Sequence, residues 1–121
     1  MPKTVLVCDD EPYILESVGY VAREEGYSVL MADNGDDALR LARAESPDVM
    51  ILDISMPKRD GNLVCRELKS STETRGIYII VLTAKGQEGD MRESYRCGAD
   101  EFITKPFSPR HLRRRLHEVL D

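Results

Sequence analysis

The chain has 121 residues, which is enough for one hydrophobic core of ordinary size and too few for two, so we expect residues 1–121 to form one domain. Hydrophobic residues make up 41% of the sequence and charged residues 32%, which excludes a disordered or fibrous chain. The formal net charge of −5 argues against direct binding of nucleic acid by this domain.

Short apolar runs rich in Val and Ile alternate with stretches of helical spacing along the first half of the chain. In order, the predicted elements are a strand at Thr4–Cys8, a helix from Pro12 to the stop at Gly26, a strand at Ser28–Ala32 and a helix from the cap at Asn34 to Ser46-Pro47. The strands lack polar alternation, which is typical of strands that are buried on both faces.

The same alternation continues in the second half. The predicted elements are a strand at Asp48–Leu52, a helix from about Asp60-Gly61, a strand at Ile77–Thr83, a helix over roughly Glu88–Arg96, a strand at Glu101–Thr104 and a helix capped by Ser108 that starts at Pro109. Five strands alternating with five helices predict a doubly wound α/β fold with a parallel sheet. In such folds the ligand crevice lies beyond the carboxyl ends of the strands.

The sequence gives little sign of a membrane span, a signal segment or a disulfide framework. The longest apolar run, Ile77–Leu82, is far shorter than the roughly 20 residues that a membrane span needs. No signal-like segment precedes the acidic run at Asp9, so we expect a cytoplasmic protein without membrane contact. The spacing of the cysteines fits neither a disulfide framework nor a zinc motif, and we expect all three thiols to be reduced. They are Cys8, Cys65 and Cys97.

Polar residues gather at the expected strand ends. They are Asp9, Asp10 and Glu11 after the first strand, Asp53 after the third, Thr83 at the end of the fourth and Lys105 after the fifth. Each has a structural alternative: Asp9 or Asp10 as a helix cap, Asp53 as a turn residue, Thr83 as a strand former and Lys105 as solvated surface. Those alternatives do not explain why complementary groups occur at four of the five strand ends.

Together these groups favour phosphoryl chemistry. Carboxylates that are buried together repel one another unless a cation neutralises them, and oxygen ligands open to water suit Mg²⁺ better than zinc. Lys105 supplies another positive charge and Thr83 a hydroxyl for an anionic oxygen, which is what a transferring phosphoryl group needs. The nucleophile would be a carboxylate, because the crevice offers no Ser–His or Cys–His pair.

Several motifs in their order and spacing resemble the receiver domain of bacterial two-component response regulators. They are Val5-Leu6-Val7-Cys8-Asp9-Asp10-Glu11, Asp48-Val49-Met50-Ile51-Leu52-Asp53-Ile54-Ser55-Met56-Pro57 with Asp60-Gly61, Val81-Leu82-Thr83-Ala84, Gly98-Ala99-Asp100 and Thr104-Lys105-Pro106-Phe107-Ser108-Pro109. The resemblance covers essentially the whole chain. It implies a flavodoxin-like sheet with strand order 2-1-3-4-5.

The resemblance also assigns roles to the polar residues. Asp53 would accept a phosphoryl group from a phosphohistidine of a sensor histidine kinase or a phosphotransfer protein. Asp10, Asp53 and the backbone carbonyl of Ser55 would bind Mg²⁺, and Asp9 would assist. Lys105 would pair with Asp53 and then with the phosphoryl oxygens, and its bond to Pro106 is commonly cis in this family. The domain would catalyse only its own phosphorylation and dephosphorylation, so it would not be an enzyme for a separate substrate.

The resemblance further implies a switch. Thr83 would turn toward the phosphoryl group and Phe102 would turn inward behind it, which changes the face made by the fourth helix, fifth strand and fifth helix. That face would contact an output domain or a downstream partner. The switch aromatic is often Tyr, so Phe102 lacks a hydroxyl at this position. Ser55 and Lys85 occupy the two positions that often tune hydrolysis of the phosphoaspartate.

The segment from Thr83 to Leu120 looks most like receivers joined to winged-helix DNA-binding domains, which dimerise through charge pairs. Asp100, Glu101 and Arg115 fit that scheme, whereas Met91 and His111 stand where charged partners are usual, so a homodimer is left open. The run Arg113-Arg114-Arg115 lies on an amphipathic helix, which favours a solvated or partner-facing surface over nucleic-acid contact.

Two other functions remain as alternatives. A Mg²⁺-dependent phosphohydrolase with an aspartate nucleophile normally has an acidic residue two positions after that aspartate, where this chain has Ser55. A receiver-like interaction scaffold that works without phosphate would not need the complete polar set. A flavin site is disfavoured, because the acidic residues after the first strand would repel a phosphate.

Overall fold

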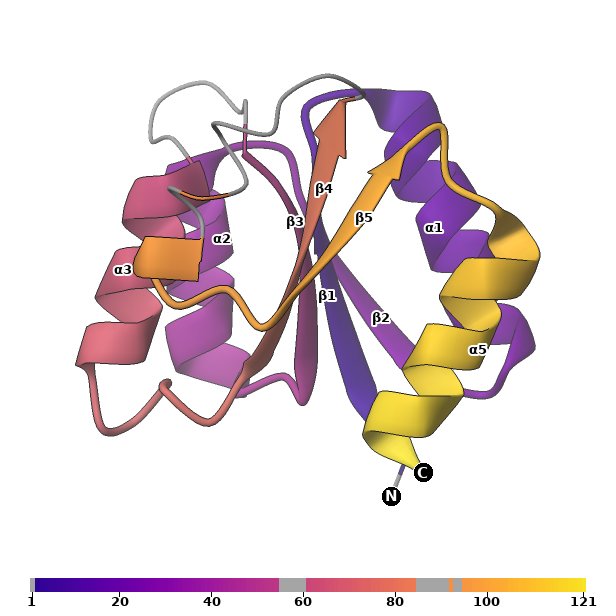
Figure 1. The fold of residues 1–121 in the computed structure, drawn as a ribbon. Coiled ribbons are helices and arrows are strands. Elements are labelled where there is room, and N and C mark those ends of the chain that lie inside the picture. Colours follow the sequence, from indigo (N-terminus) through magenta and orange to yellow (C-terminus); the bar gives the residue numbers. More distant parts are fainter. Residues whose placement is uncertain (1, 55–60, 85–91, 93–94) are drawn as a thin grey trace.

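The computed structural model describes residues 2–54, 61–84, 92 and 95–121. Its strands are β1 (Thr4–Cys8), β2 (Ser28–Ala32), β3 (Val49–Asp53), β4 (Tyr78–Ala84) and β5 (Glu101–Lys105), and its helices are α1 (Pro12–Glu24), α2 (Gly35–Glu45), α3 (Gly61–Ser70) and α5 (Pro109–Leu120). All five strands are parallel, in the order β2-β1-β3-β4-β5 (Figure 1). The predicted α/β class, parallel sheet and strand order are therefore confirmed.

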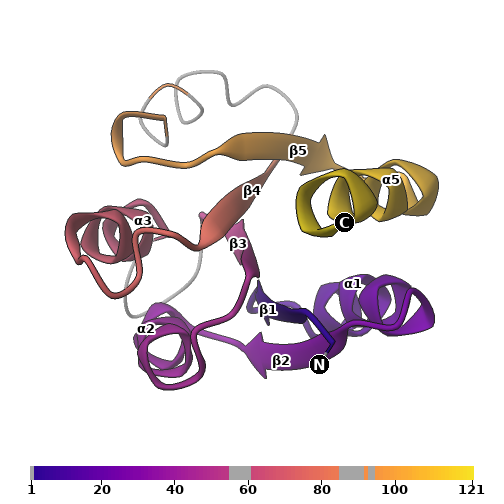
Figure 2. The ribbon, with the colours of Figure 1, turned by 90° about the horizontal axis from the view of Figure 1, so that it is seen from below.

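Helices cover both faces of the sheet, with α2 and α3 on one side and α1 and α5 on the other (Figure 2). On the α2/α3 side, fully buried residues such as Leu6, Met50 and Leu68 form one core. On the α1/α5 side, Val7, Ile80 and Leu112 belong to a second core. Each such buried side chain contributes about 1.5–3 kcal/mol of hydrophobic stabilisation. Because helices cover both faces of the sheet, the strands do not alternate apolar with polar residues.

The predicted bounds of three strands shift slightly. The third and fourth strands begin and end one residue later than expected, and the fifth extends by one residue. Asp53 stays in the ladder opposite Leu82, and Lys105 stays opposite Ala84. Asp53 and Lys105 are therefore the last residues of their strands rather than the first residues after them.

Helix ends follow the sequence signals, except at α1. The side chain of Asn34 accepts a hydrogen bond from the Asp37 amide (2.9 Å), and that of Ser108 accepts one from the His111 amide (3.3 Å). The N-cap of α1 is Glu11, whose side chain makes no capping bond, so neither Asp9 nor Asp10 serves as that cap.

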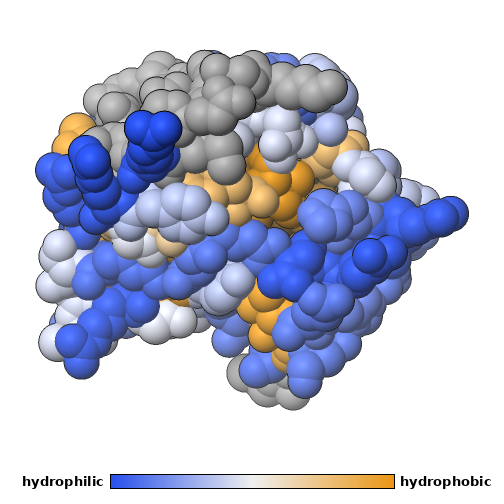
Figure 3. Space-filling model, in the orientation of Figure 1, coloured by the Kyte–Doolittle hydropathy of each residue, from blue (hydrophilic) through white to orange (hydrophobic). Residues whose placement is uncertain are grey.

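The helix predicted over roughly Glu88–Arg96 lies mostly outside the described residues. Within the described part of the chain, no helix is long and apolar enough to cross a membrane. The exposed side of α5 is hydrophilic, and hydrophobic side chains show mainly between α5 and the sheet (Figure 3).

Candidate functional site

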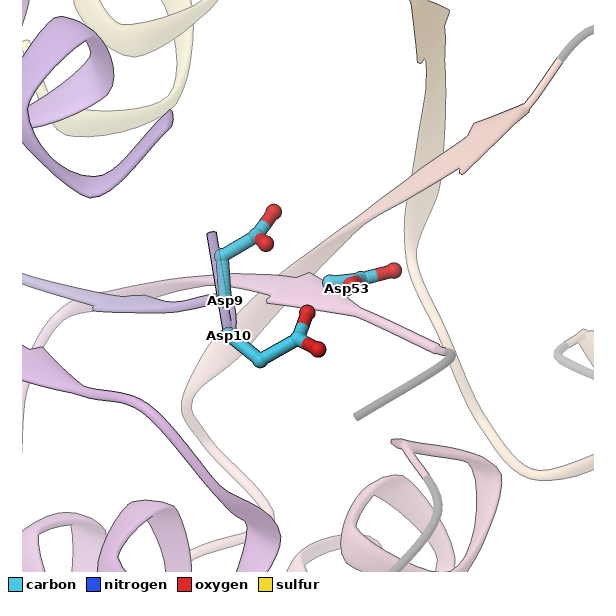
Figure 4. A group of neighbouring side chains, drawn as sticks. All are labelled: Asp9, Asp10 and Asp53. Carbon is cyan, nitrogen blue, oxygen red and sulfur yellow. The ribbon is translucent and has the colours of Figure 1, made fainter. Parts of the chain in front are cut away.

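Three carboxylates meet at the carboxyl ends of β1 and β3. Asp9 and Asp10 follow β1, Asp53 ends β3, and one oxygen of each lies within 4.8 Å of the others (Figure 4). Asp9 and Asp53 are buried, with exposed fractions of 0% and 5%, whereas Asp10 is exposed. The parallel pairing of β1 with β3 produces this cluster, because both strands end at the same edge of the sheet.

Lys105 reaches the carboxylates from the end of β5. Its Nζ lies 3.0 Å from Asp9 Oδ2, 3.7 Å from Asp53 Oδ2 and 4.0 Å from Glu11 Oε1. Partial burial lowers the pKa of Lys105, but the nearby carboxylates outweigh this effect and hold that pKa above its usual value. The ammonium group is therefore charged at neutral pH, and its shortest contact is with Asp9 rather than with Asp53.

Asp9 is the most constrained of the three carboxylates. Its Oδ1 accepts a hydrogen bond from the Glu11 amide (3.0 Å), and its backbone amide donates to the Ala32 carbonyl (3.1 Å). Among the described residues, no aligned hydrogen-bond donor reaches its buried Oδ2, which has only the ion pair with Lys105. One ammonium cannot neutralise three clustered carboxylates, so this site fits an additional cation.

The donor set indicates which cation fits. All three groups are carboxylate oxygens, and one of them is open to solvent, which suits a hard ion that keeps part of its water shell. The two histidines, His111 and His117, lie on α5, and the three cysteines are buried free thiols. Burial raises the pKa of Cys65 to about 12, so this thiol stays protonated and inert. These observations favour Mg²⁺ over a softer metal.

Gly61 supports the backbone behind Asp53. Its amide donates to the Ile54 carbonyl (3.1 Å), and a Cβ atom there would lie 2.6 Å from Ile54 Cα and 2.8 Å from the Asp53 carbonyl oxygen. Only glycine allows the start of α3 to approach the end of β3 this closely. The sequence indicated Gly61 as the start of a helix and as part of a receiver-like motif, but nothing in its spacing shows this contact.

Thr83 and Phe102 lie on the α3 side of the sheet. Thr83 is 2% exposed, and it neighbours Thr104 in the β4–β5 ladder, two positions beyond the pair of Val81 with Phe102. Phe102 packs against the core on that side, and its ring meets the Tyr95 ring edge-on, with the centroids 4.3 Å apart. The two predicted switch residues therefore share one face, and Tyr95 is a neighbour that the sequence motifs did not indicate.

A groove of about 470 Å³ lies beside Lys105, between the start of α1 and the segment that leads into α5. Its lining includes Tyr13, Phe107 and Pro109, and the Tyr13 side chain is 65% exposed. The Lys105–Pro106 peptide bond at its edge is cis, as the resemblance implied. The groove therefore presents a largely apolar surface beside Lys105.

The residues proposed for a dimer are paired within the chain. Asp100 Oδ2 lies 2.9 Å from Lys69 Nζ, and Arg115 donates two hydrogen bonds to Glu101, of 2.5 and 2.7 Å. Tyr78 also donates to Glu101 (2.8 Å), and His111 is exposed. Predictions for Ser55, Lys85 and Met91 lie outside the described residues.

Known proteins resemble this chain in sequence and in fold. A family model described as the response regulator receiver domain matches residues 5–117. The alkaline phosphatase synthesis transcriptional regulatory protein PhoP of Bacillus subtilis (strain 168) is 40% identical over 120 residues, which cover 99% of this chain and 49% of that protein. The chain therefore spans about half the length of this curated relative.

Two solved structures illustrate the likeness. The chemotaxis response regulator CheY4 of Vibrio cholerae has a TM-score of 0.92 and 29% identity, with 99% of this chain and 100% of that chain covered. The receiver domain of a sensor histidine kinase of Pseudomonas aeruginosa PAO1 has a TM-score of 0.90 and 28% identity, with 98% of each chain covered. That second structure has a magnesium ion coordinated in its active-site cleft.

Proposed function

Because this chain belongs to the response regulator receiver domain family, as the match over residues 5–117 shows, we propose that Asp53 is its phosphoacceptor. The donor is a phosphohistidine on a sensor histidine kinase or a phosphotransfer protein. The carboxylate of Asp53 forms the new O–P bond, the N–P bond of the phosphohistidine breaks, and the imidazole leaves with the electron pair.

The observation that carries this proposal is the convergence of Asp9, Asp10 and Asp53 within 4.8 Å, with Lys105 beside them. Asp10, Asp53 and the Ser55 carbonyl would hold Mg²⁺, with help from Asp9, and the ion would supply positive charge for the phosphoryl oxygens. Asp53 is 5% exposed, so little of this residue is open to bulk water.

Lys105 changes partners in this scheme. Before transfer it pairs with Asp9 and Asp53, and afterwards its ammonium contacts an oxygen of the phosphoryl group on Asp53. Thr83 donates its hydroxyl to another phosphoryl oxygen, and Phe102 moves into the space behind it. The shared face of Thr83 and Phe102 supports this coupling.

The partners follow from the same scheme. An output domain or downstream protein reads the face that includes β5 and α5, and the relative from Bacillus subtilis is a transcriptional regulatory protein. Direct nucleic-acid contact by this domain is disfavoured, because Arg113 pairs with Glu25 and Arg115 with Glu101. A homodimer through the charge pairs would have to exchange the internal pairs of Glu101 and Asp100.

We further propose that residues 1–121 form one domain and that this domain works in the cytoplasm, where histidine kinases present their phosphoryl groups.

The test is phosphorylation of the purified chain by acetyl phosphate. With Mg²⁺ present, intact mass spectrometry should show the added mass of one phosphoryl group, and Asp53→Asn should remove it. Asp36→Asn, an exposed aspartate on α2, is the matched control and should keep the phosphoryl group.

A persistent added mass in Asp53→Asn would overturn the assignment of the phosphoacceptor. Steady release of phosphate from a phosphoester would instead favour the phosphohydrolase. Unchanged contacts with a partner after complete phosphorylation would favour the scaffold that works without phosphate.

A further inference from the structure

A cluster of charged side chains joins the last turn of α5 to the turn between α1 and β2. It lies at the opposite end of the sheet from the carboxylates of the phosphoryl site, near the two ends of the chain (Figures 1 and 2). His117 is at its centre, and its partners are Glu25, Tyr27 and Asp121. None of these residues has a role in the proposed phosphoryl transfer.

Both ring nitrogens of His117 face carboxylates. Nε2 lies 2.6 Å from Glu25 Oε1, and Nδ1 lies 2.5 Å from Asp121 Oδ2. An ionised carboxylate can only accept hydrogen bonds, so both nitrogens must carry a proton in this arrangement. The geometry therefore requires the imidazolium form of His117.

Tyr27 offers a second partner at one of the two nitrogens. Its hydroxyl lies 3.0 Å from His117 Nδ1 and donates to Asp121 Oδ1 at 3.2 Å. While Nδ1 carries a proton, the hydroxyl can only donate to Asp121. Asp121 is thus held by two donors, the imidazolium and the phenol.

Charged side chains from α5, from the segment before β1 and from the end of α1 surround the cluster. Arg113 Nε of α5 lies 3.1 Å from Glu25 Oε2, so Glu25 stays paired whichever form His117 takes. Lys3, which precedes β1, acts electrostatically on Asp121. Glu24 at the end of α1 accepts a hydrogen bond from Tyr20.

The electrostatics agree in direction with the geometry. The hydrogen bond to Glu25 and then that to Asp121 raise the pKa of His117 above its usual value, and the same contact with His117 lowers the pKa of Asp121. Burial raises the pKa of Tyr27 to about 12, so Tyr27 keeps its proton while His117 titrates.

We propose that protonated His117 is a latch that fixes Asp121, at the end of α5, beside Tyr27 in the turn between α1 and β2. When Nδ1 loses its proton to solvent, it becomes an acceptor, and the Tyr27 hydroxyl turns to donate to it. Asp121 then loses both donors in one step, while Nε2 keeps its proton and its hydrogen bond to Glu25. The latch acts at the far end of α5 from Lys105, so it responds to pH independently of phosphorylation at Asp53.

The first test is an NMR titration of the intact chain. His117 and His111 are its only histidines, so both ring signals can be assigned and followed. We expect Glu25→Gln to move the His117 midpoint to lower pH and to leave the His111 midpoint in place. A His117 midpoint that Glu25→Gln leaves unchanged would overturn the latch.

The second test uses the unsubstituted chain, so it does not depend on how any variant folds. Amide hydrogen-exchange protection factors, which correct for the intrinsic pH dependence of exchange, should fall for residues 118–121 as pH rises through the His117 midpoint. Protection in the middle of α1 should not change. Constant protection of residues 118–121 across that midpoint would refute the latch, whether or not Asp53 accepts a phosphoryl group.

Discussion

Replacing Lys105 by Met should change two properties of the site in opposite directions. The substitution removes an ammonium group that lies 3.0 Å from Asp9 Oδ2 and 3.7 Å from Asp53 Oδ2, and it keeps most of the aliphatic stem. A cation that binds the carboxylates must compete with this ammonium. Removal of the ammonium should therefore raise the affinity for Mg²⁺, although it removes a group that stabilises phosphoryl transfer.

The size of the effect follows from the shorter distance. Two unit charges 3.0 Å apart interact by about 1.4 kcal/mol even at the dielectric constant of water, and by several-fold more inside a protein. The lower figure corresponds to about a tenfold change in an equilibrium constant, so we expect Lys105→Met to bind Mg²⁺ at least about tenfold more tightly. Loss of one charged stabilising group should slow phosphorylation by about 10²–10³-fold.

Calorimetric Mg²⁺ titration and the rate of mass increase with acetyl phosphate measure the two quantities. Arg114→Met removes the same charge from an exposed position on α5, and it should change neither by more than about twofold, because screening weakens distant surface charges. General damage to the site would lower both Mg²⁺ affinity and rate. A folded Lys105→Met protein with unchanged or weaker Mg²⁺ binding would refute the competition between Lys105 and the metal.

Two further substitutions test the scaffold around the site. Gly61→Ala should lower the free energy of unfolding by about 1–3 kcal/mol in chemical denaturation, because the new Cβ atom would clash with the backbone. A Cβ atom at Gly76 would meet open space, so Gly76→Ala should change the free energy of unfolding by no more than about 0.5 kcal/mol. Equal effects of the two substitutions would contradict the close approach at Gly61. Arg115→Gln should destabilise the protein most near neutral pH. Burial raises the pKa of Glu101, but the hydrogen bonds from Arg115 and Tyr78 outweigh burial and lower that pKa. The stability that the Arg115–Glu101 pair contributes is therefore present above the unfolded-state pKa of Glu101 and is lost as the pH falls through its folded-state pKa. A stability difference that stays constant from neutral to acidic pH in urea titrations would refute that linkage.

The strand pattern and the strand-end residues could be predicted from local sequence, because a strand buried on both faces is recognisable from its run of apolar residues. β1 and β2 have the expected bounds for this reason. The ends of β3 and β5 were each misplaced by one residue, because Asp53 and Lys105 are polar in sequence yet remain in the ladder opposite Leu82 and Ala84. Pairing with a neighbouring strand outweighs the polarity of a terminal residue.

Contacts between distant segments were not predictable from local patterns. Glu101 and Arg115 fit the charge pattern of a receiver dimer in the sequence, but spacing alone does not show that they also pair with each other within the chain. His117 and Glu25 are 92 positions apart, and only the packing of α5 beside α1 brings them together. The closeness of Gly61 to Asp53 likewise depends on tertiary structure.

The most direct measurement of the central claim is chemical identification of the phosphorylated residue. Borohydride reduces an aspartyl phosphate to homoserine, so the phosphorylated chain can be reduced, digested and sequenced by mass spectrometry. We expect homoserine at position 53 only after incubation with Mg²⁺ and a phosphodonor. Homoserine at position 9 or 10 instead, or at no position despite an added phosphoryl mass, would contradict the assignment of Asp53 as the phosphoacceptor.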